Sequence, residues 1–161
     1  MTADVIELLD RITQDPGFPE GSAWWRYRFE PNEVIVREGE QGASLYVVKR
    51  GRLRVTGRVE LEQKRFVQPG ICDLHEGDLF GEHCLFEPGH RSASVVGLTE
   101  GELLEIDGIR LGGYLDLHPD LGYVLLKRMF VTSSRRLGRA NQRVEHLFAW
   151  GLKAHGIDQH L

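Results

Sequence analysis

The chain has 161 residues, of which 41% are hydrophobic and 27% are charged, and its formal net charge is −4 at pH 7. This suits one globular domain, and no run of Lys or Arg marks a nucleic-acid-binding arm. No stretch approaches the roughly 20 apolar residues that span a bilayer, the start lacks the features of a signal peptide, and the two cysteines lack a CxxC spacing. We therefore expect a cytoplasmic protein without a membrane segment, a disulfide framework or a zinc site.

The first 22 residues predict a helix followed by a loop. Apolar residues recur at helical spacing as Val5, Leu8, Leu9 and Ile12, which predicts an amphipathic helix over residues 3–14. The segment 15–22 contains two prolines and two glycines, so it ends any regular structure.

Residues 23–118 have the pattern of a mainly β domain. From Trp24, the apolar residues Trp25, Tyr27 and Phe29 alternate with arginines, and glycine-containing turns separate further short apolar runs. The clearest alternation covers residues 52–62, where Gly57 predicts a bend or a bulge. Such strands favour an antiparallel β-barrel or jelly roll, flanked here by a short N-terminal helix and a long C-terminal helix.

The segment 78–95 combines groups that suit a small anion. A glycine-containing acidic turn leads into residues that can form one helical turn, whose free N–H groups and partial positive charge favour an anion. Arg91 heads the following predicted strand and adds a planar guanidinium that suits phosphate oxygens. Glu82 is suited to accept hydrogen bonds from hydroxyl groups. This combination suggests a sugar phosphate as the ligand.

Three motifs in order resemble the cyclic nucleotide-binding domains of the catabolite activator protein family and of the regulatory subunits of cyclic-AMP-dependent kinase. They are Glu38–Gly42 with Leu45–Val48 and Gly51, then His75–Glu82, and a cassette of Phe80–Glu82 with Arg91–Ser94. The likeness covers residues 25–150, with Ala43 where an Asp is common. It implies a regulatory module that binds a cyclic nucleotide, needs no metal and is not an enzyme.

The resemblance also implies roles for individual residues. Arg91 would bind the cyclic phosphate and Glu82 the ribose 2′-hydroxyl, while Gly81 and the backbone N–H groups of Cys84 and Ser92 would complete the anion cradle. The structural alternative for Arg91 is a surface side chain paired with Glu87 or Glu102. The predicted ligand-binding residues are those of the cassette and one position of the long helix: Phe80, Gly81, Glu82, His83, Cys84, Arg91, Ser92, Ala93 and Asn141.

Recognition of the base depends on the long C-terminal helix. The catabolite activator protein reaches the purine there with a Thr-Ser pair, and an alignment on Arg135–Leu137 places Ala140 and Asn141 at that point. Of these two residues, only Asn141 has a side chain that can hydrogen-bond a base. Ser92 is compatible with adenine and with guanine, so cyclic AMP is favoured over cyclic GMP by the family alone.

Two cassette residues depart from the usual aliphatic and small residues of the family. We expect Cys84 to be a buried small side chain rather than a redox sensor. His83 would either narrow or polarise the pocket, or face solvent. If the two residues block the pocket, the chain is a degenerate, nucleotide-free dimerisation scaffold.

The last predicted element is a helix over residues 119–150, which begins at His118–Asp120 and is followed by a tail, 151–161. Steps of three and four residues define an a/d heptad seam: Tyr123, Leu126, Phe130, Ser133, Leu137, Ala140, Val144 and Leu147. We expect this seam to form a parallel homodimer, the alternative being a helix that folds back over the β domain alone. The tail is too short for a helix-turn-helix, so we expect no direct DNA contact and an unidentified downstream protein partner.

A rival function is a cupin-like metalloenzyme on a similar barrel. Its metal would have to be bound by His75, Glu82, His83 and His90. Cupins use two histidines separated by one residue, but Asp73 and Gly77 stand at that spacing from His75. The motif therefore fails, and this alternative is disfavoured.

Overall fold

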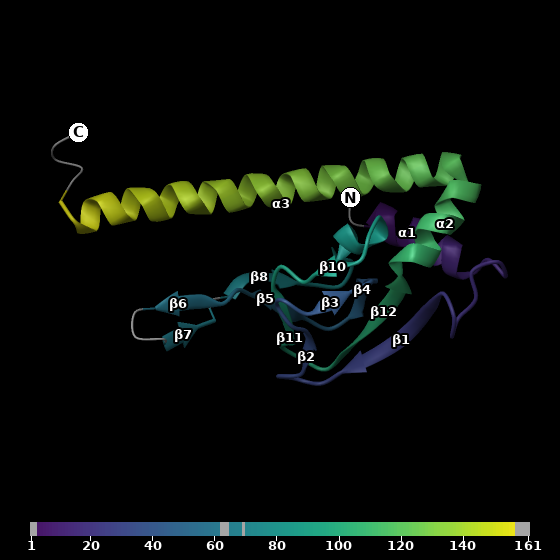
Figure 1. The fold of residues 1–161 in the computed structure, drawn as a ribbon, viewed down its shortest axis with the longest axis horizontal. Coiled ribbons are helices and arrows are strands. Elements are labelled where there is room, and N and C mark those ends of the chain that lie inside the picture. Colours follow the sequence, from purple (N-terminus) through teal and green to yellow (C-terminus); the bar gives the residue numbers. More distant parts are fainter. Residues whose placement is uncertain (1–2, 62–64, 69, 157–161) are drawn as a thin grey trace. The chain divides into compact units, whose positions relative to one another are not determined.

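The computed structural model describes residues 3–61, 65–68 and 70–156. Its internal contacts divide the chain into two compact units, residues 1–123 and 124–161. The helices are α1 (Ala3–Thr13), a short 3-10 helix η2 (Glu82–Leu85), α2 (Gly108–Leu117) and α3 (Pro119–Ala154). The strands, labelled in Figure 1 except for β9, are in chain order β1 (Trp24–Phe29), β2 (Val34–Val36), β3 (Gln41–Gly42), β4 (Ser44–Arg50), β5 (Leu53–Thr56), β6 (Val59–Leu61), β7 (Arg65–Val67), β8 (Gly70–Leu74), β9 (Leu79–Phe80), β10 (Gly89–His90), β11 (Ser94–Gly97) and β12 (Gly101–Asp107).

The strands form antiparallel sheets of the predicted jelly-roll type. One four-stranded sheet has the order β1-β12-β4-β9, a second has the order β2-β11-β5-β8, and two small sheets pair β10 with β3 and β6 with β7. The part of the chain that the structure describes contains no closed barrel, so the fold takes the open, jelly-roll form of the two that were predicted. The reason is the short edge strand β9, which pairs with only Tyr46 and Val47 of β4 and does not continue into the second sheet.

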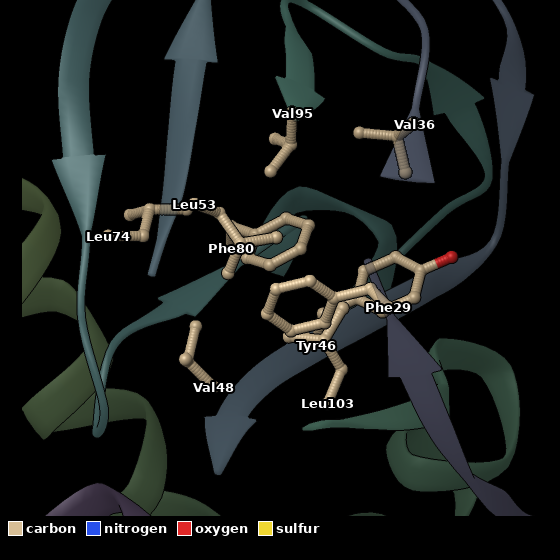
Figure 2. Close-up of a cluster of buried hydrophobic side chains, with 9 residues drawn as sticks. All are labelled: Phe29, Val36, Tyr46, Val48, Leu53, Leu74, Phe80, Val95 and Leu103. Carbon is tan, nitrogen blue, oxygen red and sulfur yellow. The ribbon is translucent and has the colours of Figure 1, made fainter. Parts of the chain in front are cut away.

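The core lies between the two four-stranded sheets. Figure 2 shows nine buried side chains that converge from both of them: Phe29, Val36, Tyr46, Val48, Leu53, Leu74, Phe80, Val95 and Leu103. The alternation predicted for β1 is only partly correct. Trp24 is buried and its indole N–H donates to the carbonyl of Phe18 at 3.0 Å, whereas Trp25 is 37% exposed.

The long strand predicted over residues 52–62 is broken. β5 ends at Thr56 and β6 begins at Val59 in a separate two-stranded sheet. The backbone N–H of Arg58 donates to Glu38 Oε2 at 2.9 Å, so it does not extend the ladder of β5. The alternation predicts that Val59 and Leu61 point into the core, but their side chains are not among those that the structure describes.

The helices of the first unit follow the sequence pattern. α1 buries Val5, Leu8, Leu9 and Ile12, as its spacing predicts. Asp107 is the N-cap of α2, where its carboxylate accepts from the backbone N–H of Arg110 at 2.8 Å. Tyr114 of α2 donates from its hydroxyl to Asp15 at 2.6 Å, which joins α2 to the loop after α1.

The second unit is the long part of α3 from Val124 onward. α3 begins at the predicted Pro119 and ends at Ala154, four residues beyond the predicted end. Large apolar side chains on it are exposed, including Phe130, Leu137, Val144 and Leu147. The structure therefore confirms the helix, and the use of its seam stays a prediction.

Candidate functional site

Arg91 is fixed in place by its backbone. Its N–H donates to the carbonyl of Glu40 at 2.8 Å, and its own carbonyl accepts from the N–H of Gly39 at 2.8 Å. Directly before it, β10 pairs with β3, which matches Gly89 with Gly42. The motif Glu38–Gly42, called the glycine-rich motif below, is thus hydrogen-bonded to the end of the cassette. The two segments lie about 50 residues apart in the sequence.

The Arg91 side chain is buried, with only 7% of its surface exposed. Among the residues that the structure describes, it is the only buried one that is polar or charged. The predicted alternative, a surface arginine paired with Glu87 or Glu102, is therefore wrong. Glu102 instead lies 4.0 Å from Arg28.

The guanidinium of Arg91 has no carboxylate partner in the described part of the chain. Its Nη1 donates to the sulfur of Cys84 at 3.4 Å, and its Cζ lies 5.5 Å from the centre of the Tyr46 ring. A buried cation of this kind is costly unless an anion compensates it. The arrangement is therefore suited to receive a negatively charged ligand.

Two glycines make room for this guanidinium. A Cβ at Gly42 would lie 2.2 Å from Arg91 Nε, and one at Gly81 would lie 2.8 Å from Arg91 Nη1. Gly81 also has a φ of 75°, in the left-handed region that favours glycine. Both positions accept the arginine only because they have no side chain.

The cassette residues near Arg91 come from β9 and η2. Phe80 is buried on β9 and stacks on Tyr46 with ring centres 4.9 Å apart. Glu82 is half-buried and begins η2. The backbone N–H of Cys84 donates to the carbonyl of Gly81 at 3.1 Å, so its part in an anion cradle stays a prediction.

The remaining predicted residues lie in three different settings. Cys84 is fully buried, as expected, whereas His83 and Ser92 are exposed and Ala93 is half-buried. β11 begins at Ser94, so Arg91 and Ser92 precede this strand rather than head it. Asn141 is exposed on α3 in the second unit, and its approach to a base stays a prediction.

Sequence reasoning missed Gly42 and Tyr46 as parts of the site. Gly42 closes the glycine-rich motif, and Tyr46 belongs to a predicted strand, but neither pattern indicates a contact with Arg91. The pKa of the Tyr46 hydroxyl is raised well above its usual range by burial and by the charge of Glu105, which also accepts a hydrogen bond from it at 3.1 Å. Tyr46 is therefore neutral at physiological pH and can offer its ring face to the cation.

A surface hollow elsewhere on the first unit contrasts with this site. It measures about 630 Å³ and is lined by charged residues of β1, β4 and β12. Its cations have nearby carboxylates: Arg28 with Glu102 at 4.0 Å, and Arg50 with Glu100 at 3.6 Å. Because these charges are already compensated, the hollow is a weaker candidate for anion binding than Arg91.

The described residues contain no group of three or more His, Cys, Asp or Glu side chains that could hold a metal ion. His75 lies 3.9 Å from Asp78, and His90 Nε2 lies 3.2 Å from the Gln41 amide nitrogen. None of the helices within the described residues is long and apolar enough to cross a membrane.

Comparison with known proteins identifies the family. The sequence profile described as the cyclic nucleotide-binding domain matches residues 26–116, more than half of the chain, and this range includes Arg91 and the whole cassette. The chain belongs to the cyclic nucleotide-binding domain family.

The curated relatives of this cyclic nucleotide-binding domain include a transcriptional regulator and an ion channel. A CRP-like cAMP-activated global transcriptional regulator of Mycobacterium tuberculosis is 26% identical over 142 residues, which cover 88% of this chain and 55% of the regulator. A potassium/sodium hyperpolarization-activated cyclic nucleotide-gated channel of Mus musculus is 29% identical over 140 residues, which cover 83% of this chain and 16% of the channel. The chain thus spans about half of the regulator and a small part of the channel.

Solved structures support the same fold. The catabolite activator protein of Thermus thermophilus is 25% identical, with a TM-score of 0.62 over 88% of this chain and 59% of that one. A cyclic nucleotide-binding domain of Methylobacillus flagellatus has a TM-score of 0.67 over 88% of this chain and 81% of that one, at 20% identity. The second likeness bears on the fold alone.

Proposed function

We propose that this domain is a regulatory sensor that binds a cyclic purine mononucleotide, cyclic AMP in preference to cyclic GMP. The observation that carries the proposal is the buried Arg91 guanidinium, which is 7% exposed and has no carboxylate partner among the described residues. A cyclic phosphate carries one negative charge and has two exocyclic oxygens that can accept from a guanidinium. Binding such a group would compensate the buried charge of Arg91.

The other ligand contacts are part of the same proposal. Glu82 is half-buried at the start of η2 and would accept from the ribose 2′-hydroxyl, which a carboxylate does well. Asn141 of the long helix would hydrogen-bond the base. The preference for cyclic AMP is supported by the mycobacterial regulator, which is cAMP-activated.

The signal would leave the domain through α3. We propose that the a/d seam pairs two copies of this helix in a cytoplasmic homodimer, and that the ligand changes the angle or the order of α3 for a downstream protein partner. The ligand does this only if it binds the two states with different affinity. This role requires neither a metal nor a chemical reaction, so we assign no enzymatic activity and no nucleic-acid contact to residues 1–161.

Thermal unfolding tests the proposal on the purified domain, in the absence of any downstream partner. At cyclic AMP concentrations of 100 times Kd, one site stabilises the folded state by about 2.7 kcal/mol, which raises Tm by roughly 5–10 °C. We expect a smaller rise with cyclic GMP at the same concentration and no rise with adenosine. A Tm that no cyclic nucleotide changes, in protein shown to be free of bound nucleotide, would support the scaffold alternative instead.

A further inference from the structure

The sulfur of Cys84 is placed between two groups of the candidate site. Its thiol donates to the carbonyl of Gly42 at 3.2 Å, and it accepts from Arg91 Nη1 at 3.4 Å. Cys84 and Arg91 are both buried, so the contact between them is shielded from water, whereas the contact with Gly42 is only partly buried. The thiol therefore links the glycine-rich motif to the arginine.

We propose that the Cys84 side chain is a positioning residue for Arg91, which holds the guanidinium ready for the phosphate while leaving its charge uncompensated. This inference rests on the proposed function, because it gives a role to a second residue of the same site. The burial of Arg91 supports this role independently of the cysteine. Its charged side chain is 93% buried, and its Nη1 points at the sulfur.

A thiol at this position explains how the arginine is held without an ion pair. A carboxylate at this position would hold Arg91 more firmly, but it would form an ion pair and compete with the ligand. A thiol is a weak acceptor and a weak donor, so it orients Nη1 and leaves the full positive charge for the ligand. An alanine would give neither contact and would leave a small cavity beside the guanidinium.

The first test is the affinity for cyclic AMP of three variants, measured by calorimetric titration. We expect Cys84→Ala to weaken binding by about tenfold, since losing a hydrogen bond to a charged group has an effect of this order. Cys84→Ser, which keeps a donor and an acceptor, should weaken binding less than Cys84→Ala does. Cys84→Asp should weaken it by about a hundredfold or more while the protein stays folded, because the new carboxylate compensates Arg91 from inside.

Two controls separate positioning from stability. Ile12→Val removes a buried methylene group on α1, outside the cassette, and should lower Tm without changing the affinity. In an Arg91→Lys background, replacing Cys84 by alanine should change the affinity by less than twofold, because the fork that the sulfur holds is gone.

A ligand-free measurement keeps this inference distinct from the proposed function. In nitrogen-15 NMR spectra, we expect the Nη1 protons of Arg91, which donate to the sulfur, to exchange slowly with water in the wild-type protein and at least several times faster in Cys84→Ala. If wild-type protein binds no cyclic nucleotide, the proposed function fails. Two results would overturn this inference when the wild-type protein binds cyclic AMP. In one, Cys84→Ala and Cys84→Asp bind it as tightly as the wild type does; in the other, the Arg91 protons exchange at the same rate in Cys84→Ala and the wild type.

Discussion

At the scale of the residue, the candidate site depends on the absence of a side chain at Gly42. A Cβ there would lie 2.2 Å from Arg91 Nε and 2.4 Å from its Cζ, so alanine would displace the guanidinium. The displaced group is the end of a flexible side chain, so the fold should survive.

We therefore predict that Gly42→Ala weakens the binding of cyclic AMP by tenfold or more, as measured by titration, with only a small change in Tm. The matched control is Gly113→Ala on α2, where a Cβ would meet nothing within 4 Å. It should leave the affinity unchanged and stabilise the protein by roughly 0.5–1 kcal/mol, because alanine is the better helix former. Equal affinities of Gly42→Ala and wild type would contradict the assignment of Arg91.

The sequence predicts the chemistry of these residues better than their contacts. Residue type and spacing predict Arg91 and Glu82 as ligands of a phosphate and a hydroxyl group, roles that stay predictions, and Cys84 is buried as expected. The contacts with Gly42 and Tyr46 could not be predicted, because they depend on how β10 pairs with β3 and how β4 lies beside η2. These are long-range pairings that local patterns do not encode.

At the scale of the element, the hydrogen bond between Tyr114 and Asp15 links α2 to the loop after α1. The pKa of the Asp15 carboxyl is lowered, mainly by this bond and then by the backbone N–H of Gly17. The same bond raises the pKa of Tyr114 to about 12, so the tyrosine remains a donor at neutral pH. A carboxyl group whose pKa is lower in the folded protein stabilises the fold at pH values above its pKa in the unfolded chain. This stabilisation is lost as the pH falls through the pKa of the folded state.

We predict that Tyr114→Phe raises the pKa of Asp15 toward its ordinary value, as measured by a carbon-13 NMR titration of the carboxyl group. The stability of the variant should also depend less on pH on the acid side, because the shift that causes this dependence is smaller. An unchanged Asp15 pKa would show that the bond does not persist in solution.

Elements with a local signal were predicted well, and elements that depend on partners were not. The start of α3 at Pro119 follows from residue type, and it is present. The break between β5 and β6 falls at Gly57, where the sequence predicts a bend or a bulge, but the bond from Arg58 to Glu38, which is 20 residues away in the sequence, was not predicted. Periodicity within residues 52–62 cannot reveal that contact.

At the scale of the whole molecule, α3 carries apolar side chains that a monomer exposes to water. Phe130, Leu137 and Val144 follow each other at seven-residue spacing, and they are 73%, 63% and 65% exposed. This is the a position of the predicted heptad seam. Pairing two such helices would bury these side chains.

We predict that Leu137→Glu converts the proposed homodimer to monomers in sedimentation-velocity experiments at micromolar concentration, because it places two like charges in an apolar seam. Gln142→Glu makes a similar change at the exposed f position and should leave the dimer intact. If wild-type protein sediments as a monomer, the seam has another use.

The central claim is that Arg91 binds the phosphate of a cyclic nucleotide. Calorimetric titration of nucleotide-free protein with cyclic AMP and cyclic GMP, beside Arg91→Ala and the exposed control Arg28→Ala, tests it most directly. We expect micromolar or tighter binding of cyclic AMP, weaker binding of cyclic GMP, no detectable binding by Arg91→Ala and unchanged binding by Arg28→Ala. Binding that survives in Arg91→Ala, or its absence in the wild-type protein, would show that Arg91 does not have this role.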